Sequence, residues 1–591
     1  MKVFYVGQDA NKRKALLKRK EDLLLLGFDR WDDYDYKTLF PVQCYINGES
    51  IQTGGIKILF KGEKVSYRYL DDLIASGWSG EFPVPDVSYV SVPGNTTFYE
   101  QIEAHLGNAS TLEVARALND ASLRRWIDHD SSCIELTESE GFRHSLLRER
   151  GAQTAYHSVW KVLSAEEMNM ADMLFHFIDS CGDGQVLDLG FDSTNRILPR
   201  DIHVLIGPNG VGKSQALMQM VEYWLDLSHE DDEEVGFEDS PNINQLVVVS
   251  YSPFERFPID SANSVKKSGK RLDLDVYKYF GLRGWQSVYD STGKSKKKIR
   301  LSHSQPKINA ARSLLACLAD DQTYGAIKDW SAKLRTMESV LSAAIDFDCA
   351  AVAVRPDAKL QKIFDESSLF FLDKEIHDDD VVVRLTMERG SAGTEMVLVP
   401  IASDRIDALD VDVLSQEIIA NKGIYFLKNG RVIELSSGQR LFSYVVINIL
   451  GAIRRNSLVL IDEPELFLHP TLEITFLSML KEVLQNYRSK ALLATHSLVT
   501  VRELPRSCVH VFEKEDGQVF INHPPFETFG GDIQRISSYV FGDKSVSKPF
   551  EAWIRQCLKE FGSAESLIEA LGDDINEEMI IQISAMGAGK W

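Results

Sequence analysis

The sequence predicts an α/β fold with a mixed sheet, a largely helical inserted lobe and an N-terminal α+β extension. Three apolar runs of strand length predict the sheet. Ile202 to Ile206 is followed by a glycine-rich turn and then by a helical pattern from Gln215 to Trp224. Gln245 to Ser250 is continuously apolar, as buried parallel strands are. A third run, Leu458 to Ile461, ends in two adjacent carboxylates.

Composition limits the classes of protein that this chain can belong to. Its 591 residues are 44% apolar and 26% charged, which is typical of a globular protein with more than one core. We find neither an apolar run of about 18 residues nor a charged-then-apolar leader at Met1, so we expect no membrane contact and a cytoplasmic location. The seven cysteines contain no C-x-x-C pair, which favours reduced thiols over a zinc ribbon. The net charge of −22 repels nucleic-acid phosphates, so a contact with nucleic acid would need a local basic patch.

Changes of pattern along the chain divide it into five predicted regions. They are an N-terminal α+β accessory region (1–155), the first part of the main lobe (156–258), the inserted lobe (259–427), the second part of the main lobe (428–545) and a C-terminal helical tail (546–591). Within these regions, Asn11 to Leu26 and Ala165 to Ile178 are predicted to be helices.

The turn after the first apolar run has the pattern G-x-x-x-x-G-K-[ST]. Its glycines let backbone N–H groups turn inward, and the helix that follows directs its positive dipole end at the same point. Lys213 can then reach the β- and γ-phosphates of ATP, and the Ser214 hydroxyl can bind Mg²⁺. The predicted phosphate-binding residues are Gly207, Pro208, Asn209, Gly210, Val211, Gly212, Lys213 and Ser214.

Two later segments are predicted to complete this site. Ser436, Ser437, Gly438 and Gln439 open the apolar helix from Leu441 to Ile453, where hydroxyls and backbone N–H groups can bind a γ-phosphate. The strand that ends at Ile461 delivers Asp462 to the Mg²⁺ shell and Glu463 to the attacking water.

The motifs GPNGVGKS, LSSGQR, LVLIDEPELFLHP and ATHS, in this order, resemble an ABC-type ATPase head of the SMC, RecF and OLD-nuclease branch. The resemblance covers about 156–258 and 428–545 and implies a P-loop NTPase fold of ABC-ATPase type. It also implies that the chain forms a homodimer or a higher homo-oligomer, in which Ser436 to Gln439 of one copy complete the site of the other. Glu463 and Lys213 would act in catalysis, and His496 matches the switch histidine that senses the γ-phosphate.

The chain departs from that family at two positions. Ser437 replaces the first glycine of the LSGGQ signature. The family places a Mg²⁺-contacting glutamine after the strand that corresponds to Gln245 to Ser250, whereas this chain has Tyr251-Ser-Pro-Phe-Glu-Arg256. Ser252 and Glu255 are the candidate replacements.

The overall layout is similar to the PtuA ATPases of Septu anti-phage systems and their retron-associated relatives. This narrower resemblance implies a regulatory ATPase that works with a separate HNH nuclease of the PtuB kind and, in the retron-associated case, with a retron reverse transcriptase and its nucleic acid. The alternative is a DNA-maintenance ATPase of the RecF or SMC type that clamps DNA directly. An intrinsic nuclease like that of OLD proteins would need a metal-binding domain with D-x-D carboxylates in the part of the chain after the ATPase motifs. No D-x-D motif follows Ser497, so we expect no intrinsic nuclease.

A basic segment from Lys266 to Arg300 lies within the inserted lobe. It holds eleven lysines and arginines against three aspartates, with five aromatic residues interleaved: Tyr277, Tyr279, Phe280, Trp285 and Tyr289. This composition favours contact with nucleic acid or with an acidic partner through charge and stacking. A solvated loop is the alternative.

Overall fold

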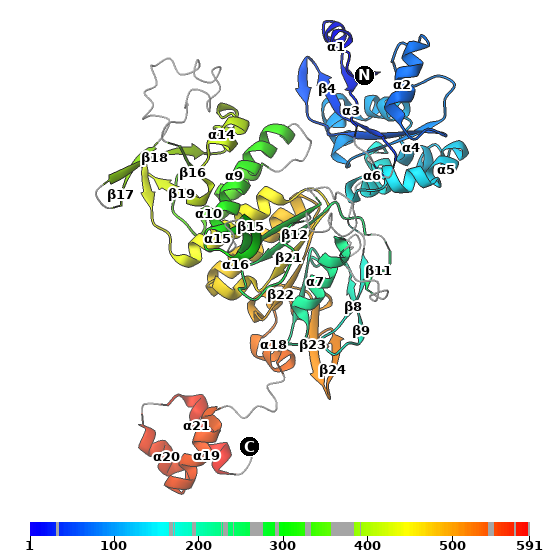
Figure 1. Cartoon of the computed structure of the whole chain (residues 1–591). Helices are drawn as coiled ribbons and strands as arrows, with labels where there is room; N and C mark the ends of the chain where they lie inside the picture. The colour runs from blue at the N-terminus through cyan, green and yellow to red at the C-terminus, as the bar shows by residue number, and fades with distance from the viewer. Residues whose placement is uncertain are drawn as a thin grey trace. The chain divides into compact units, whose positions relative to one another are not determined.

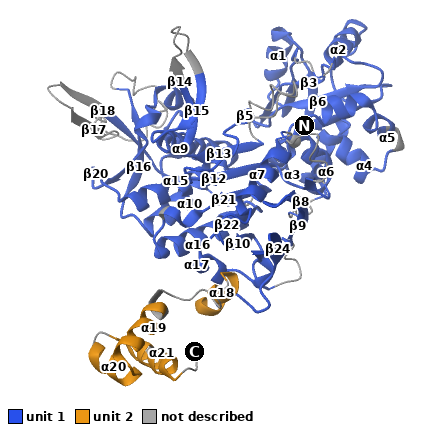
Figure 2. Cartoon of the chain, turned by 60° about the horizontal axis from the view of Figure 1, so that its bottom comes forward, with its two compact units in different colours: residues 1–530 blue, residues 531–591 orange. Residues whose placement is uncertain are grey.

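The computed structural model describes most of the chain, namely residues 1–30, 33, 35–164, 170, 172–191, 197–225, 227, 235–239, 241–260, 276–289, 295–325, 332–355, 383–389, 392–541, 549–572 and 575–588. Contacts between these residues define two compact units, Met1–Gly530 and Gly531–Trp591, which Figure 2 shows in different colours. The finer domain boundaries expected from the sequence stay predictions.

A seven-stranded mixed sheet lies at the centre of the larger unit (Figure 1). Its strand order is β13-β12-β21-β22-β10-β23-β24, and only the β23–β24 pair is antiparallel. The strands are β10 (Ile202–Ile206), β12 (Gln245–Ser250), β13 (Tyr277–Gly281), β21 (Ser457–Asp462), β22 (Lys490–Thr495), β23 (Val509–Glu515) and β24 (Gln518–Asn522). The predicted mixed sheet is therefore confirmed. Because its other pairs are parallel, the chain leaves β10, β12, β21 and β22 at the same edge of the sheet.

The two faces of this sheet are covered by different elements. Helix α7 (Lys213–Trp224) packs on one face together with a small sheet of order β11-β8-β9. Those three strands are β8 (Met173–Ile178), β9 (Gly184–Leu189) and β11 (Gly236–Phe237). Helices α15 (Ser437–Ala452) and α16 (Pro470–Asn486) lie on the other face, where their side chains line one small cavity with Val249 and Ile461 of the sheet.

Two of the predicted helices are wrong in part. The described part of Ala165 to Ile178 contains strand β8, because Met173, Phe175 and Phe177 alternate into the core with the period of a strand. Residues 165–169 lie outside the described part of the chain.

In the region predicted as a helix from Asn11 to Leu26, helix α1 (Ala10–Leu17) ends early and Leu23–Leu26 forms strand β2. The four leucines of β2 are all buried, and they pair in parallel with β1 (Lys2–Tyr5). Burial on both faces removes the polar alternation that would have identified a strand.

The N-terminal region has two small sheets, of order β1-β2-β4-β5 and β3-β6-β7, with helices packed around one core. It contacts the sheet edge opposite the glycine-rich loop: Thr154 Oγ1 donates to Ile243 O at 3.0 Å, just before β12 begins. Its further elements are β3 (Leu39–Phe40), β4 (Val42–Ile46), β5 (Glu49–Ile51), β6 (Ile56–Phe60), α2 (Ser66–Ala75), β7 (Tyr89–Pro93), α3 (Thr97–Ala117), α4 (Ala121–Trp126), α5 (Ser131–Thr137), the π-helix η1 (Phe142–Leu146) and α6 (Arg150–Leu163).

The inserted lobe is mixed, whereas the sequence predicted it to be largely helical. Short apolar runs such as Cys349–Val354 pair across long intervals into an antiparallel sheet of order β17-β18-β16-β19-β20, and local pattern does not reveal such pairing. The elements are the hairpin β14 (Arg283–Tyr289) and β15 (Ser295–Leu301), α9 (Gln305–Tyr324), α10 (Lys333–Ser342), β16 (Cys349–Val354), β17 (Val383–Arg389), β18 (Ala392–Ile401), η2 (Ile406–Ala408), α14 (Val411–Glu417), η3 (Ala420–Lys422), β19 (Ile424–Lys428) and β20 (Arg431–Ile433).

Buried polar contacts tie this lobe to helix α15. Lys333 is fully buried, and its Nζ donates to Ile453 O, just after α15, and to Asp320 of α9, both at 2.8 Å. At the other end of α15, Gln439 Nε2 donates to Ala344 O at 2.8 Å. Truncating a buried partner of this kind costs about 3–5 kcal/mol, so the helix and the lobe are expected to move together.

The remaining elements of the larger unit are η4 (Pro464–Phe467), α17 (Leu498–Arg502) and η5 (Arg506–Cys508). The smaller unit contains α18 (Ile533–Val540), α19 (Pro549–Phe561), α20 (Ala564–Leu571) and α21 (Glu577–Gly587), with a small apolar core around Ile554, Leu567 and Ile583. In the described part of the chain, no helix combines the length and the apolar character needed to cross a bilayer.

Candidate nucleotide site

The glycine-rich loop follows β10 directly and leads into α7. Gly207 has φ 152°, and a Cβ at this position would lie 2.2 Å from the carbonyl oxygen of Phe512, so only glycine fits. Gly210 and Gly212 have φ values of 80° and 102°, in the region that side chains disfavour. Gly212 is also the N-cap of α7. The loop thus takes a conformation that leaves the N-terminus of α7 accessible to an anion.

Lys213 lies under this loop, and the loop's own carbonyl groups satisfy its ammonium. Its Nζ donates to Gly207 O and to Pro208 O, both at 2.9 Å. Burial lowers the pKa of Lys213 to about 8, while the charges of Glu463, Asp462 and Glu465 act in the opposite direction.

Ser214 and Asp462 meet across the site, although 248 positions separate them in the sequence. Ser214 Oγ donates to Asp462 Oδ1 at 2.8 Å. Burial raises the pKa of Asp462 to about 6 against the effect of this hydrogen bond. A hydroxyl and a carboxylate beside a phosphate loop are the hard oxygen ligands that Mg²⁺ prefers, so these two residues fit the ion.

Glu463 follows Asp462 in a left-handed conformation, with φ 52° and ψ 57°. This conformation is uncommon for a residue with a side chain and is often found at functional sites. Its N–H donates to Ala494 O on the neighbouring strand β22 at 2.8 Å, which holds the backbone in place. The strained backbone therefore fixes the point from which the Glu463 side chain leaves the sheet.

Glu465 holds the loop that carries His496, a role that the sequence did not suggest. Its Oε1 accepts from the backbone N–H of His496 at 2.5 Å, and its Oε2 accepts from Thr495 Oγ1 at 2.8 Å. Burial raises the pKa of Glu465. Burial and the Lys213 charge lower the pKa of His496, so its imidazole is neutral at pH 7. Its place within the motif LVLIDEPELFLHP was the only sequence signal for Glu465.

The turn formed by Ser436, Ser437, Gly438 and Gln439 lies at the N-terminus of α15. Ser436 Oγ accepts from Gln439 N at 3.3 Å, and Gln439 Oε1 accepts from Ser436 N at 3.1 Å, which together form a capping box. Ser436 and Ser437 are exposed. Among the described residues, no hydrogen bond or ion pair of this turn reaches residues 207–214 of the same chain.

The structure thus brings Lys213, Ser214, Asp462, Glu463 and His496 together, and the turn at 436–439 contributes no polar contact to them within one chain. A cleft of about 560 Å³ opens beside Ser214 and Asp462 and is also lined by Met218, Glu255 and Phe257.

Of the two candidate replacements for the missing glutamine, Glu255 is already engaged. Its carboxylate accepts from Arg283 Nε at 2.7 Å, from Tyr279 OH at 2.5 Å and from Phe257 N at 2.8 Å. Ser252 is buried, and its side chain stays a candidate.

The basic segment divides into parts with different environments. Tyr277, Tyr279 and Phe280 are buried in strand β13, so the prediction that they stack on a partner is wrong: they belong to the core of the sheet. Trp285 is 40% exposed. Residues 266–275 and 290–294 lie outside the described part of the chain.

The parallel sheet, the loop between β10 and α7 and the acidic end of β21 define a P-loop NTPase fold. A family model described as "AAA domain, putative AbiEii toxin, Type IV TA system" matches residues 271–502, which contain Asp462, Glu463 and His496. The matched residues are thus similar to an AAA-type ATPase domain, and they do not include the glycine-rich loop at residues 207–214.

Similar proteins include "Protein ea59" of Escherichia phage lambda, which is 22% identical over 575 residues and is matched over 94% of this chain and 93% of its own length. Among solved structures, the SMC head domain from Thermotoga maritima is 14% identical, with a TM-score of 0.23 and coverage of 61% of this chain and 100% of that one. Stu0660 of Streptococcus thermophilus is 9% identical, with a TM-score of 0.26 and coverage of 66% and 85%.

Proposed function

We propose that this chain hydrolyses ATP and that each site is completed by the Ser436–Gln439 turn of a second copy. The observation that carries the proposal is the exposed turn, which has no polar contact with the phosphate loop of its own chain among the described residues. A surface that presents a helix N-terminus to solvent suits the γ-phosphate of a nucleotide held by another copy.

The roles of the residues follow from their positions. Mg²⁺, when bound, supplies positive charge that stabilises the phosphates, and Ser214 and Asp462 are the residues that would hold it. Lys213 exchanges the carbonyls of Gly207 and Pro208 for phosphate oxygens. Glu463 orients the attacking water and accepts its proton. Neutral His496 donates a hydrogen bond to the γ-phosphate.

For the output of this cycle, we propose that the ATPase regulates a separate effector nuclease in anti-phage defence, in the cytoplasm. Support comes from the resemblance to PtuA ATPases and from the toxin-system description of the matching family model. The expected partners are an HNH nuclease of the PtuB kind and a retron reverse transcriptase with its nucleic acid. Co-purification from the native host, or a gene for such a partner beside this one, tests the assignment.

The second candidate function is a DNA-maintenance ATPase that clamps DNA itself. The exposed cations on the hairpin β14–β15 favour it. The expectation that the chain has no nuclease activity of its own is common to both candidates, and incubation of the purified chain with plasmid DNA and Mg²⁺ or Mn²⁺ tests it.

Mixing two inactive variants tests the shared site. Lys213→Ala removes the phosphate contact of one chain, and Ser437→Arg blocks the turn of the other. When the two variants pair at random in a symmetric dimer, about half of all dimers are heterodimers, and each heterodimer contains one intact site out of two. An equimolar mixture should therefore regain about a quarter of the wild-type ATPase rate. A site completed within one chain predicts that the mixture stays as inactive as either variant alone.

A further inference from the structure

The hairpin β14–β15 carries positive charge in a chain whose net charge is −22. Its two strands, Arg283–Tyr289 and Ser295–Leu301, contain five lysines and arginines and no acidic residue. Lys297, Lys298 and Arg300 are exposed, and within the described part of the chain they form no salt bridge. Cations without counter-charges that are concentrated on one element produce a local positive potential, which attracts a polyanion despite the net charge.

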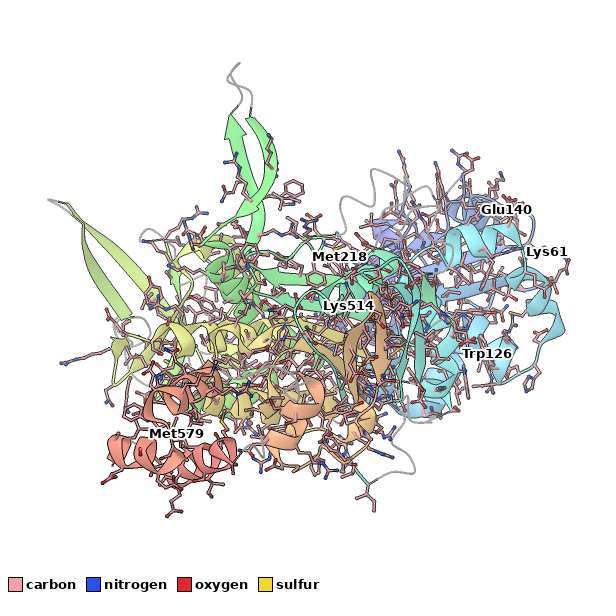
Figure 3. The ribbon with its side chains drawn as sticks, turned by 90° about the horizontal axis from the view of Figure 1, so that it is seen from below. Lys61, Trp126, Glu140, Met218, Lys514 and Met579 are labelled. Atoms are coloured by element: carbon pink, nitrogen blue, oxygen red, sulfur yellow. The ribbon has the colours of Figure 1, made fainter. Side chains whose placement is uncertain are left out.

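The hairpin also projects from its neighbours, and the register of its two strands places two of its cations on one face. Figure 2 shows its strands standing away from β13 and α9, and in Figure 3 it lies clear of the part of α7 where Met218 is labelled. Gln286 pairs with Lys298 and Gly284 with Arg300, so Lys298 and Arg300 share one face of the ribbon. Alternate residues of a strand lie about 7 Å apart, and a two-stranded ribbon fits the major groove of a DNA duplex.

The base of this hairpin is fixed to the loop that lies beside the nucleotide site. Arg283, the first residue of β14, donates to Glu255 through Nε at 2.7 Å and through Nη2 at 3.1 Å. Glu255 is buried and also accepts from Tyr279 OH at 2.5 Å. A paired guanidinium and carboxylate with two hydrogen bonds has a fixed geometry, so the hairpin cannot pivot freely about its base.

Glu255 faces the nucleotide site on its other side. It lines the cleft of about 560 Å³ together with Ser214 and Asp462. Its charge also contributes to the raised pKa of Asp462, after burial and the carboxylates of Glu463 and Glu465. The same side chain therefore meets both the base of the hairpin and the two residues that would hold Mg²⁺.

We propose that the β14–β15 hairpin binds the phosphate backbone of double-stranded nucleic acid and that the Arg283–Glu255 pair couples this contact to the ATP site. The coupling rests on the proposed function. When ATP joins two copies, each head presents one hairpin to the same duplex, and the pair at the base holds both in a fixed orientation. Two hairpins on one duplex bind more tightly than one, because the second binding event is intramolecular.

The test measures the binding of a short fluorescent DNA duplex at several salt concentrations. Neutralising the hairpin with Lys297→Gln, Lys298→Gln and Arg300→Gln should weaken binding. The slope of log affinity against log salt should fall by about 0.9 for each phosphate that the variant no longer neutralises. The matched control changes Lys14, Lys18 and Arg19 to Gln, which removes the same exposed charge at α1, and it should bind as the wild type does. Equal binding by the two triple variants would overturn the proposal. So would binding of polyglutamate in place of the duplex, which would indicate an acidic protein partner.

The coupling is measured in the Glu463→Gln background, where bound ATP persists. ATP should tighten duplex binding about 100-fold, which is the low end of the gain from two linked binding events. Arg283→Lys keeps the charge but not the two-hydrogen-bond geometry, so it should keep the affinity measured without nucleotide and abolish this tightening, while a direct binding assay shows that ATP is still bound. If the tightening persists in Arg283→Lys, the coupling is wrong. If no form of the chain binds ATP, the proposed function fails, and the hairpin contact is still decided by the two triple variants.

Discussion

The carboxylate of Glu465 accepts the backbone N–H of His496 at 2.5 Å, and thereby ties the segment after β21 to the loop after β22. The second oxygen of Glu465 accepts from Thr495, so the loop that presents the imidazole is held at two consecutive residues. The position of His496 thus depends on a side chain that does not itself need to touch the nucleotide.

Replacing Glu465 with alanine should therefore impair turnover more than ATP binding. The His496 N–H and the Thr495 hydroxyl would lose a buried acceptor, and a displacement of about 1 Å near the chemistry can cost up to about 100-fold in rate. We expect kcat to fall while KM for ATP changes little, and we expect Glu465→Gln, which keeps one acceptor, to be affected less. Glu515→Ala, which removes an exposed carboxylate on β23, is the control. Equal reductions of kcat for Glu465→Ala and the control would contradict the positioning role.

Replacing Glu463 with glutamine should abolish most hydrolysis and preserve ATP binding. The amide keeps the size of the side chain but cannot accept a proton, and loss of a general base costs about 10²- to 10⁴-fold. Phosphate release measures the rate, and calorimetric titration with ATP measures binding. An unchanged rate would remove Glu463 from the catalytic role.

Replacing Gly207 with alanine should destabilise the protein and prevent nucleotide binding, because its Cβ would lie 2.2 Å from Phe512 O. Gly430→Ala is the matched control: its φ of 69° is also positive, but nothing lies within 4 Å of the added Cβ. We expect the control to cost about 1–2 kcal/mol from backbone strain alone. In urea unfolding, Gly207→Ala should lower the free energy of unfolding by more than Gly430→Ala does. A smaller loss than that of Gly430→Ala would contradict the prediction, because the loop would then have shifted to make room for the added Cβ.

Acid should destabilise the fold through buried histidines on β10 and β23. His203 Nδ1 lies 2.9 Å from His510 Nε2, and burial lowers the pKa of His203 to about 3 and the pKa of His510 well below its usual value. The unfolded chain has histidines with a pKa of about 6.5, so below that pH it binds more protons than the folded chain. Stability that is complete above about pH 6.5 is therefore lost progressively as the pH falls towards about 3.

Urea unfolding at several pH values measures this dependence. His203→Gln should reduce the slope of stability against pH between about 6.5 and about 4, and His303→Gln, which changes an exposed histidine, should leave it unchanged. Identical slopes in the wild type and both variants would show that the buried pair does not control the acid sensitivity.

Local patterns in the sequence determined the elements that form the site. Strand Gln245–Ser250 has the predicted bounds, and the apolar run Ile202–Ile206 forms strand β10, although a strand-like pattern extends back to Ile197. The position of the glycine-rich loop between a strand and a helix was likewise available from residue types and spacing alone. Two strands were predicted to be helical. Leu23–Leu26 is buried on both faces, so it lacks the polar alternation that identifies a strand, and the short alternating run Met173–Ile178 follows residues with a helical pattern.

Only the tertiary structure decided which of these elements meet. It placed β22 between β21 and β10, so that His496 and Glu463 leave adjacent strands. It also buried Tyr279 in the sheet and paired Glu255 with Arg283, where the sequence had suggested a stacking residue and a candidate metal contact. Residue type and spacing fix what a segment can become, whereas the pairing of side chains that are far apart in the sequence is set by how whole elements pack, which no local pattern contains.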